Sequence, residues 1–184
     1  MKLEKFRKAV LATGFQGFIR LLSDFKRLDK NRNNTLEFSE FADCLFNSHI
    51  QEQFSDSDLQ FLFRSFDLNN DGHINFAELM TATAGELTQF RSDRIELAWR
   101  RINATQAATV PLTDVFRHFN ASRHPAVKQG ETNEDTIVRD FQGTFNAHHE
   151  IYNSFSDTQG VSKGEFLNFY RMFSATVPID AAFN

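Results

Sequence analysis

The chain has 184 residues, of which 41% are hydrophobic and 24% charged, a composition typical of folded globular proteins. Its net charge is −4 and its pI about 5.9, which argues against nucleic acid as the main partner. No apolar run reaches the roughly 18 residues of a membrane span, and the start has neither a signal-peptide pattern nor a myristoylation glycine. With Cys44 as the single cysteine, we expect a cytoplasmic protein in a reducing compartment.

The first predicted element is a basic amphipathic helix at the start of the chain. It combines basic and apolar side chains: Lys2, Lys5, Arg7 and Lys8 with Leu3, Phe6 and Val10. Such a helix either packs on its own domain or binds a partner, and the sequence leaves both open.

Phenylalanine, present 22 times, dominates apolar stripes at helical spacing. These stripes predict buried helix faces: Phe15, Phe18, Ile19, Leu22 and Phe25; Leu59, Leu62, Phe63 and Phe66; Ile95, Trp99 and Ile102; Phe166, Phe169, Tyr170 and Phe173. Because no segment of useful length alternates as a strand would, we expect an all-α fold.

Residues 29–40, DKNRNNTLEFSE, have oxygen-bearing side chains at alternate positions. This spacing matches the twelve-residue calcium loop of the EF-hand, in which such side chains converge on one cation. Asn34 replaces the usual glycine at place 6, and asparagine is one of the few other residues that enter the left-handed region. The expected ligands are Asp29, Asn31, Asn33, the carbonyl of Thr35 and Glu40, with Glu37 at place 9.

Residues 67–78, DLNNDGHINFAE, fit the same loop at every place. Gly72 stands at place 6, where the sharp turn needs a positive φ. The expected ligands are Asp67, Asn69, Asp71, the carbonyl of His73 and Glu78, with Asn75 acting directly or through water. The His73 imidazole itself is expected to face solvent.

The two loops start 38 residues apart, at Asp29 and Asp67, as expected for a paired lobe. Leu36 and Ile74, both at place 8, are predicted to form a short β contact between the loops. We expect two Ca²⁺ ions in this N-terminal lobe, with dissociation constants of roughly 10⁻⁷ to 10⁻⁵ M. Mg²⁺ is the competing ion.

Residues 103–114, NATQAATVPLTD, retain the scaffold of the loop without its ligands. Trp99 and Ile102 precede the segment as Phe63 and Phe66 precede the second loop. Ala107, at place 5, cannot coordinate a cation. One carboxylate is too little charge to offset the dehydration of a divalent ion, so we expect a structural EF-hand without calcium.

A fourth unit is predicted around residues 153–165, NSFSDTQGVSKGE, with Glu165 at its last place. Its thirteen residues move Asp157 out of phase, so we expect no calcium here either, although Val161 can pair with Val110. A polar segment, 121–133, precedes the unit and contains Pro125 and Gly130. A helix then starts with a capping box in which Thr132 is the expected cap.

The chain resembles calcyphosin and the calcyphosin-like proteins. The resemblance rests on the GFQGF opening, the insertion RHPAVKQGETNED followed by VRDF, and the thirteen-residue fourth loop. It covers about residues 14–173 and implies four EF-hands in two lobes, no catalytic activity, and a connection to cilia and axonemes. The third loop departs from the better-known members, in which it is a competent calcium loop.

The sequence supports two non-enzymatic hypotheses, since no phosphate-binding loop, catalytic triad or zinc spacing is present. His148 and His149 point about 100° apart on a helix and are expected on the surface. The predicted domains are 1–90, which binds calcium, and 91–184, a degenerate pair with a tail. The chain is either a calcium-responsive adaptor whose C-terminal lobe docks protein partners without calcium, or a constitutive component of a ciliary, axonemal or cytoskeletal assembly.

Overall fold

The computed structural model describes residues 2–12, 14–47, 54–156 and 160–177 and is mostly helical in these ranges. The described elements are α1 (Lys2–Leu11), α2 (Phe15–Leu28), β1 (Thr35–Leu36), α3 (Phe38–Asn47), α4 (Asp56–Phe66), β2 (Ile74–Asn75), α5 (Phe76–Ala84), α6 (Gln89–Ile102), β3 (Thr109–Val110), α7 (Leu112–His118), the 3₁₀ helix η2 (Ala121–Arg123), α8 (Pro125–Lys128), α9 (Glu134–Ser156), β4 (Val161–Ser162) and α10 (Lys163–Thr176). In the described part of the chain, no helix is long and apolar enough to cross a membrane.

The chain divides into two compact units. One comprises the described parts of Met1–Arg91 and Tyr170–Asn184, and the other comprises Ser92–Phe169. The last turns of α10 therefore group with the first unit, where the Arg171 guanidinium donates a hydrogen bond to the Thr81 hydroxyl at 2.8 Å. The division into domains 1–90 and 91–184 stays a prediction.

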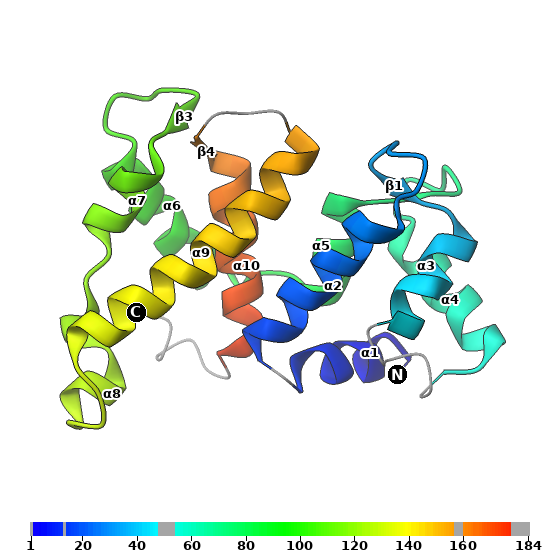
Figure 1. Cartoon of the computed structure of the whole chain (residues 1–184), viewed down its shortest axis with the longest axis horizontal. Coiled ribbons are helices and arrows are strands. Elements are labelled where there is room, and N and C mark those ends of the chain that lie inside the picture. Colours follow the sequence, from blue (N-terminus) through cyan, green and yellow to red (C-terminus); the bar gives the residue numbers. More distant parts are fainter. Residues whose placement is uncertain (1, 13, 48–53, 157–159, 178–184) are drawn as a thin grey trace. The chain divides into compact units, whose positions relative to one another are not determined.

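In the first unit, two helix-loop-helix segments are joined through their loops. Figure 1 shows α2 and α3 on either side of the loop that carries β1. β1 pairs antiparallel with β2, and Leu36 lies opposite Ile74, as predicted from their shared place in the two loops. Both side chains are fully buried, so this short contact joins the two loops through their apolar residues.

The basic helix α1 packs on its own unit. Phe6 is fully buried, and its ring lies edge-on to Phe66 of α4 at 5.1 Å. The Arg7 guanidinium donates to the Ala82 carbonyl of α5 at 2.8 Å. Lys2 pairs with Asp58 and lowers the pKa of that carboxyl to about 2. Of the two readings of this helix, the structure therefore shows the intramolecular one.

The second unit repeats the arrangement around an aromatic core. β3 pairs antiparallel with β4, and Val110 lies opposite Val161, which confirms the predicted contact. Figure 1 shows α9 as the long helix that leads toward β4 and α10. Its Phe145 is fully buried, with the Phe169 ring at 4.5 Å.

The polar segment before α9 is more ordered than its composition predicts. It contains η2 and α8, and Pro125 opens α8 at a position where its missing N–H costs nothing. The capping prediction was wrong by one residue: Asn133, and not Thr132, accepts the hydrogen bond from the Thr136 N–H, at 2.9 Å.

Candidate metal-binding loops

The second loop, residues 67–78, is organised by its own side chains. Both carboxylate oxygens of Asp67 accept backbone hydrogen bonds, from Asp71 and Gly72, each at 3.0 Å. Asn69 accepts from the Asp71 N–H at 2.9 Å, and Asp71 accepts from the His73 N–H at 2.9 Å. Each loop oxygen thus uses one lone pair on the backbone and keeps another for a different partner.

Glu78 closes the second loop from its other end. One carboxylate oxygen accepts from the N–H groups of Leu68 and Asn69 at 3.1 and 3.3 Å, and the other from Asn75 at 2.9 Å. The Asn75 side chain accepts from the Glu78 N–H in return, so the two residues form the capping box of α5. Asn75 is therefore a helix cap, a role that its place in the loop did not predict.

The turn of the second loop requires the predicted glycine. Gly72 has φ of 84°, a conformation open to glycine at little cost. The His73 expectation was only partly right, because its Nδ1 atom is buried without a hydrogen-bond partner among the described residues. The imidazole therefore does not simply face solvent.

The first loop, residues 29–40, repeats this network in spite of its different sequence. Asp29 accepts from the N–H groups of Asn33 and Asn34 at 3.0 and 2.9 Å. Asn34 has φ of 61°, so asparagine adopts the left-handed conformation expected at place 6. Glu40 reaches the N–H groups of Lys30 and Glu37 at 3.3 and 3.2 Å.

Two more side chains of the first loop take their expected places in this network. Asn31 accepts from the Asn33 N–H at 3.0 Å, and Asn33 accepts from the Thr35 N–H at 2.9 Å. These bonds are the counterparts of those made by Asn69 and Asp71 in the second loop. The two loops therefore have the same internal geometry.

Buried carboxylates stand at the first and last places of both loops. Asp29, Glu40, Asp67 and Glu78 are between 7% and 9% exposed. In the described ranges, no ion pair within 4.0 Å joins any of them to a basic side chain. A buried carboxylate is costly unless a cation or hydrogen bonds compensate it, and here the compensation comes only from N–H groups. This donor set fits a hard cation with oxygen ligands.

A cation would require a local rearrangement of these side chains. Among the described residues, no group of three or more His, Cys, Asp or Glu is gathered closely enough to hold a metal ion. In the second loop, the Asn69 amide donates to Asp71 at 2.9 Å, and this hydrogen bond is the first cause of a lowered pKa of the Asp71 carboxyl. Calcium would have to replace this hydrogen bond, because Asn69 and Asp71 are both expected ligands.

The third loop, residues 103–114, closes on itself without acidic side chains. The Asn103 side chain donates to the Ala107 carbonyl at 2.8 Å and accepts from the Ala107 N–H at 2.9 Å. Asp114 is turned toward its own helix, where Arg117 lies at 3.1 Å. In both loops, the residue at place 1 accepts a hydrogen bond from the backbone N–H at place 5. Asn103 does so with a neutral amide, whereas Asp67 does so with a carboxylate.

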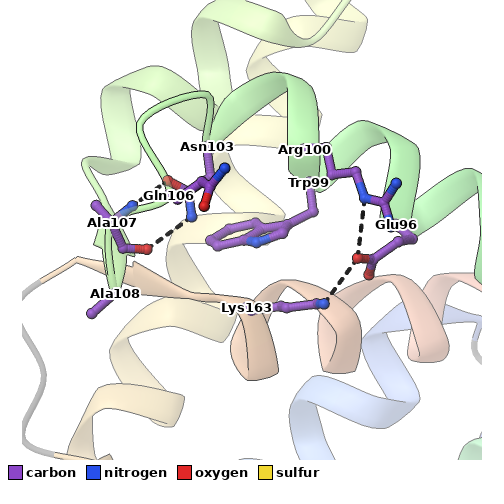
Figure 2. Close-up of a pocket in the computed structure, with 8 residues that line it drawn as sticks. All are labelled: Glu96, Trp99, Arg100, Asn103, Gln106, Ala107, Ala108 and Lys163. Carbon is purple, nitrogen blue, oxygen red and sulfur yellow. Dashed lines mark hydrogen bonds and ion pairs between the residues drawn. The ribbon is translucent and has the colours of Figure 1, made fainter.

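A pocket lies beside the third loop. Figure 2 shows the Trp99 indole between the loop and Lys163, with Asn103 and Ala107 at one end. Lys163 pairs with Glu96 at 2.9 Å, and Arg100 lies 3.5 Å from the same carboxylate oxygen. Two basic side chains thus share one carboxylate at the other end of the pocket.

The fourth unit, meaning the fourth helix-loop-helix segment (α9, β4 and α10) and not one of the two compact units, contains a buried cluster that the sequence did not predict. Glu165 is fully buried, and one of its oxygens lies 2.7 Å from Nδ1 of His149 and 3.8 Å from Nδ1 of His148. The expectation that both histidines lie on the surface was wrong: the His148 side chain is fully buried and that of His149 is 15% exposed. Asp157 lies outside the described residues.

A positional signal could have revealed the cluster. Four places before each of the first three loops stands an aromatic residue: Phe25, Phe63 or Trp99. Before the fourth loop, counted from Asn153, the same place holds His149. A polar ring in a place otherwise held by buried aromatic rings requires a partner inside the unit. That partner is Glu165.

The paired loops and their oxygen-rich side chains define a protein of the EF-hand class, and residues 19–84 match the family model described as an EF-hand domain pair. A relative, crustacean calcium-binding protein 23 of Faxonius limosus, is 30% identical over 181 residues, which are 98% of this chain and 86% of that protein. The chain therefore belongs to the EF-hand family of calcium-binding proteins.

A solved structure, that of the C-terminal domain of PF110239, matches 95% of this chain and 89% of its own length at 18% identity. The TM-score of 0.32 is too low to support an argument about fold or function.

Proposed function

We propose that the first unit binds two Ca²⁺ ions, one in each of its loops. The observation that carries this proposal is the pair of buried carboxylates at the first and last place of each loop, compensated only by backbone N–H groups. A divalent cation supplies the missing positive charge, and each loop offers three carboxylates when Glu37 or Asp71 is included.

The proposed ligands follow the loop frame. In the first loop they are Asp29, Asn31, Asn33, the carbonyl of Thr35 and Glu40; in the second they are Asp67, Asn69, Asp71, the carbonyl of His73 and Glu78. Calcium is preferred to magnesium, because a flexible shell of six to eight oxygens accepts both oxygens of a final glutamate. Mg²⁺ is the competing ion; it is smaller and requires octahedral coordination.

For the chain as a whole, we propose four EF-hands in two lobes, acting as a non-catalytic adaptor. The second lobe docks a protein partner without calcium. Support comes from the third loop, where the Asn103 amide and the Asp114–Arg117 pair satisfy the backbone and the charge without a cation. Cytoplasmic location and membership of the calcyphosin-like group belong to the same proposal.

A second candidate is a constitutive structural component of a ciliary, axonemal or cytoskeletal assembly, in which calcium only stabilises the first lobe. It is favoured by the packing of α1, because Phe6 and Val10 are at most 1% exposed and already cover an apolar surface of the first unit. Calcium-dependent binding of an apolar dye to the full chain would count against this candidate, because calcium would then expose new apolar surface.

Calorimetry of the full chain tests the proposal directly. We expect two calcium ions per chain, with both sites filled below about 1 mM. Absence of binding in this range would refute the assignment. A pull-down with and without calcium then separates the adaptor, whose partners through the second lobe persist in both conditions, from a protein that releases its partner when calcium is removed.

A further inference from the structure

The buried cluster of the fourth unit has no part in calcium binding as proposed above. In the second loop, the last-place glutamate faces the loop, and its oxygens accept from Leu68, Asn69 and Asn75. In the fourth unit, the last-place Glu165 faces His149 of the entering helix at 2.7 Å. Its second oxygen, Oε2, is buried and has no hydrogen-bond partner among the described residues.

We propose that the fourth helix-loop-helix segment binds a proton in the place where we propose calcium for the first two. His149 and Glu165 share this proton, and its release to solvent as pH rises loosens the second compact unit. The bound proton makes the pair either an imidazolium with a carboxylate or a neutral acid with a neutral ring. Both forms have no net charge. Release leaves one negative charge in a buried place.

The Asn153 amide lies beside the His149 ring. Its nitrogen is 2.9 Å from Nε2 and 3.4 Å from Nδ1, so it is close to both ring nitrogens. An amide can present either its oxygen or its nitrogen, and the two are assigned by hydrogen bonding alone. Asn153 and Glu165 therefore surround the ring with polar groups.

The direction of the pH response follows from the burial of Glu165. Burial is the first cause that raises the pKa of this carboxyl, and the hydrogen bond with His149 acts against it. A folded-state pKa above the unfolded value means that the stabilisation is present at low pH and is lost as pH rises through the folded value. The pair thus favours the folded second unit while it retains its proton.

Other titratable side chains lie near the pair. From α9, His148 also faces Glu165, but burial lowers its pKa to about 3, so it stays neutral; Tyr152 stacks on it at 5.7 Å. On the neighbouring elements, Glu96 pairs with Lys163 and Arg100, and Asp114 pairs with Arg117. From β4, Ser162 contributes a hydroxyl that accepts from the Glu165 N–H at 3.1 Å.

Trp99 reports on this site in the unmodified chain. It is the one tryptophan of the sequence, it is 5% exposed, and its ring lies 5.3 Å from that of Phe166, the neighbour of Glu165. The test is a pH titration of the full chain from 5 to 9 in a chelator, followed by Trp99 fluorescence. We expect a single step that releases one proton and shifts the emission toward that of an exposed indole.

Three variants give the proposal its controls. Glu165→Gln removes the titratable carboxyl and is expected to lose the step. His149→Phe restores the aromatic ring found at this place in the first three loops but removes the hydrogen bond that lowers the pKa of Glu165, so it is expected to move the step to higher pH. His118→Gln removes an exposed imidazole of the same unit and should keep it. A step that persists in Glu165→Gln, or that disappears in His118→Gln, would overturn the proposal.

A second measurement needs no variant. In the labelled wild-type chain, NMR signals of the His149 ring nitrogens and the Glu165 carboxyl carbon should move in the same step as Trp99. Separate steps would refute a shared proton. Repeating the titration with calcium should leave the step unchanged, and displacement of the step by calcium would show that a metal ion, and not a proton, occupies the fourth unit. Because the first titration contains no calcium, its outcome does not depend on the two calcium sites.

Discussion

Replacing Glu40 and Glu78 together by glutamine is expected to abolish the stabilisation of the first unit by calcium. Each glutamate closes its loop from the last place, where its oxygens span places 2 and 9. Glutamine has nearly the same shape but only one oxygen and no charge, so it cannot supply two oxygens to the cation. The loss should therefore appear in calcium binding more than in folding.

The magnitude follows from binding linkage. At a free calcium concentration of 100 times the dissociation constant, one site stabilises the folded state by about 2.7 kcal/mol. Two sites give about 5 kcal/mol, which for a unit of this size corresponds to a rise in Tm on the order of 20 °C. In the apo protein, the double variant weakens hydrogen bonds to carboxylates, worth about 1.5–3 kcal/mol each, but it also removes two buried negative charges.

The assay is thermal unfolding of the wild type and the double variant, each with 1 mM calcium and with a chelator. Asp114→Asn is the matched control, because Asp114 pairs with Arg117 at the surface and such pairs contribute about 0–1 kcal/mol. A calcium-induced Tm rise that survives in the double variant would refute the ligand assignment. A large loss of that rise in Asp114→Asn would show that the third loop binds calcium.

Three further changes probe parts of the molecule outside the ligand set. Phe6→Ala should destabilise the first unit by about 3–5 kcal/mol in denaturant unfolding, since the ring is fully buried; a loss under 1 kcal/mol would mean that α1 is not part of the core. Gly72→Ala should cost about 1 kcal/mol through its φ of 84° alone, because nothing lies within 4 Å of an added Cβ, and a larger calcium-independent loss of Tm would indicate a steric cause. His148 has a pKa lowered by burial to about 3, so its neutral form stabilises the fold above pH 6.5 and this contribution falls as pH drops below that value. Between pH 6.5 and 5 the loss is about 2 kcal/mol, and His148→Phe should remove this part of the acid sensitivity of the second unit in urea unfolding; an unchanged sensitivity would contradict the assignment.

The geometry of the two loops of the first unit was predictable because its information is local. Alternate oxygens, a residue able to adopt positive φ and a final glutamate all fall within twelve residues, and the hydrogen bonds of Asp29, Asp67 and Glu78 run within the same stretch. The contacts of Leu36 with Ile74 and of Val110 with Val161 were also predictable, because place 8 has the same role in every loop. The same local logic indicated that the third loop lacks ligands.

Contacts between distant segments were decided only by the tertiary structure. Adjacent histidines on a helix looked like surface residues, but α9 turns His148 into the aromatic core and His149 toward Glu165, sixteen residues further along the chain. The sequence also did not decide whether the basic first helix packs on its own domain or binds a partner. The contact between the Phe6 and Phe66 rings shows that it packs on its own unit. Helical periodicity shows which side chains share a face, but it does not say what covers that face. For this protein, the sequence by itself determined the internal geometry of the two N-terminal loops, and the packing of its helices decided which polar side chains are buried together.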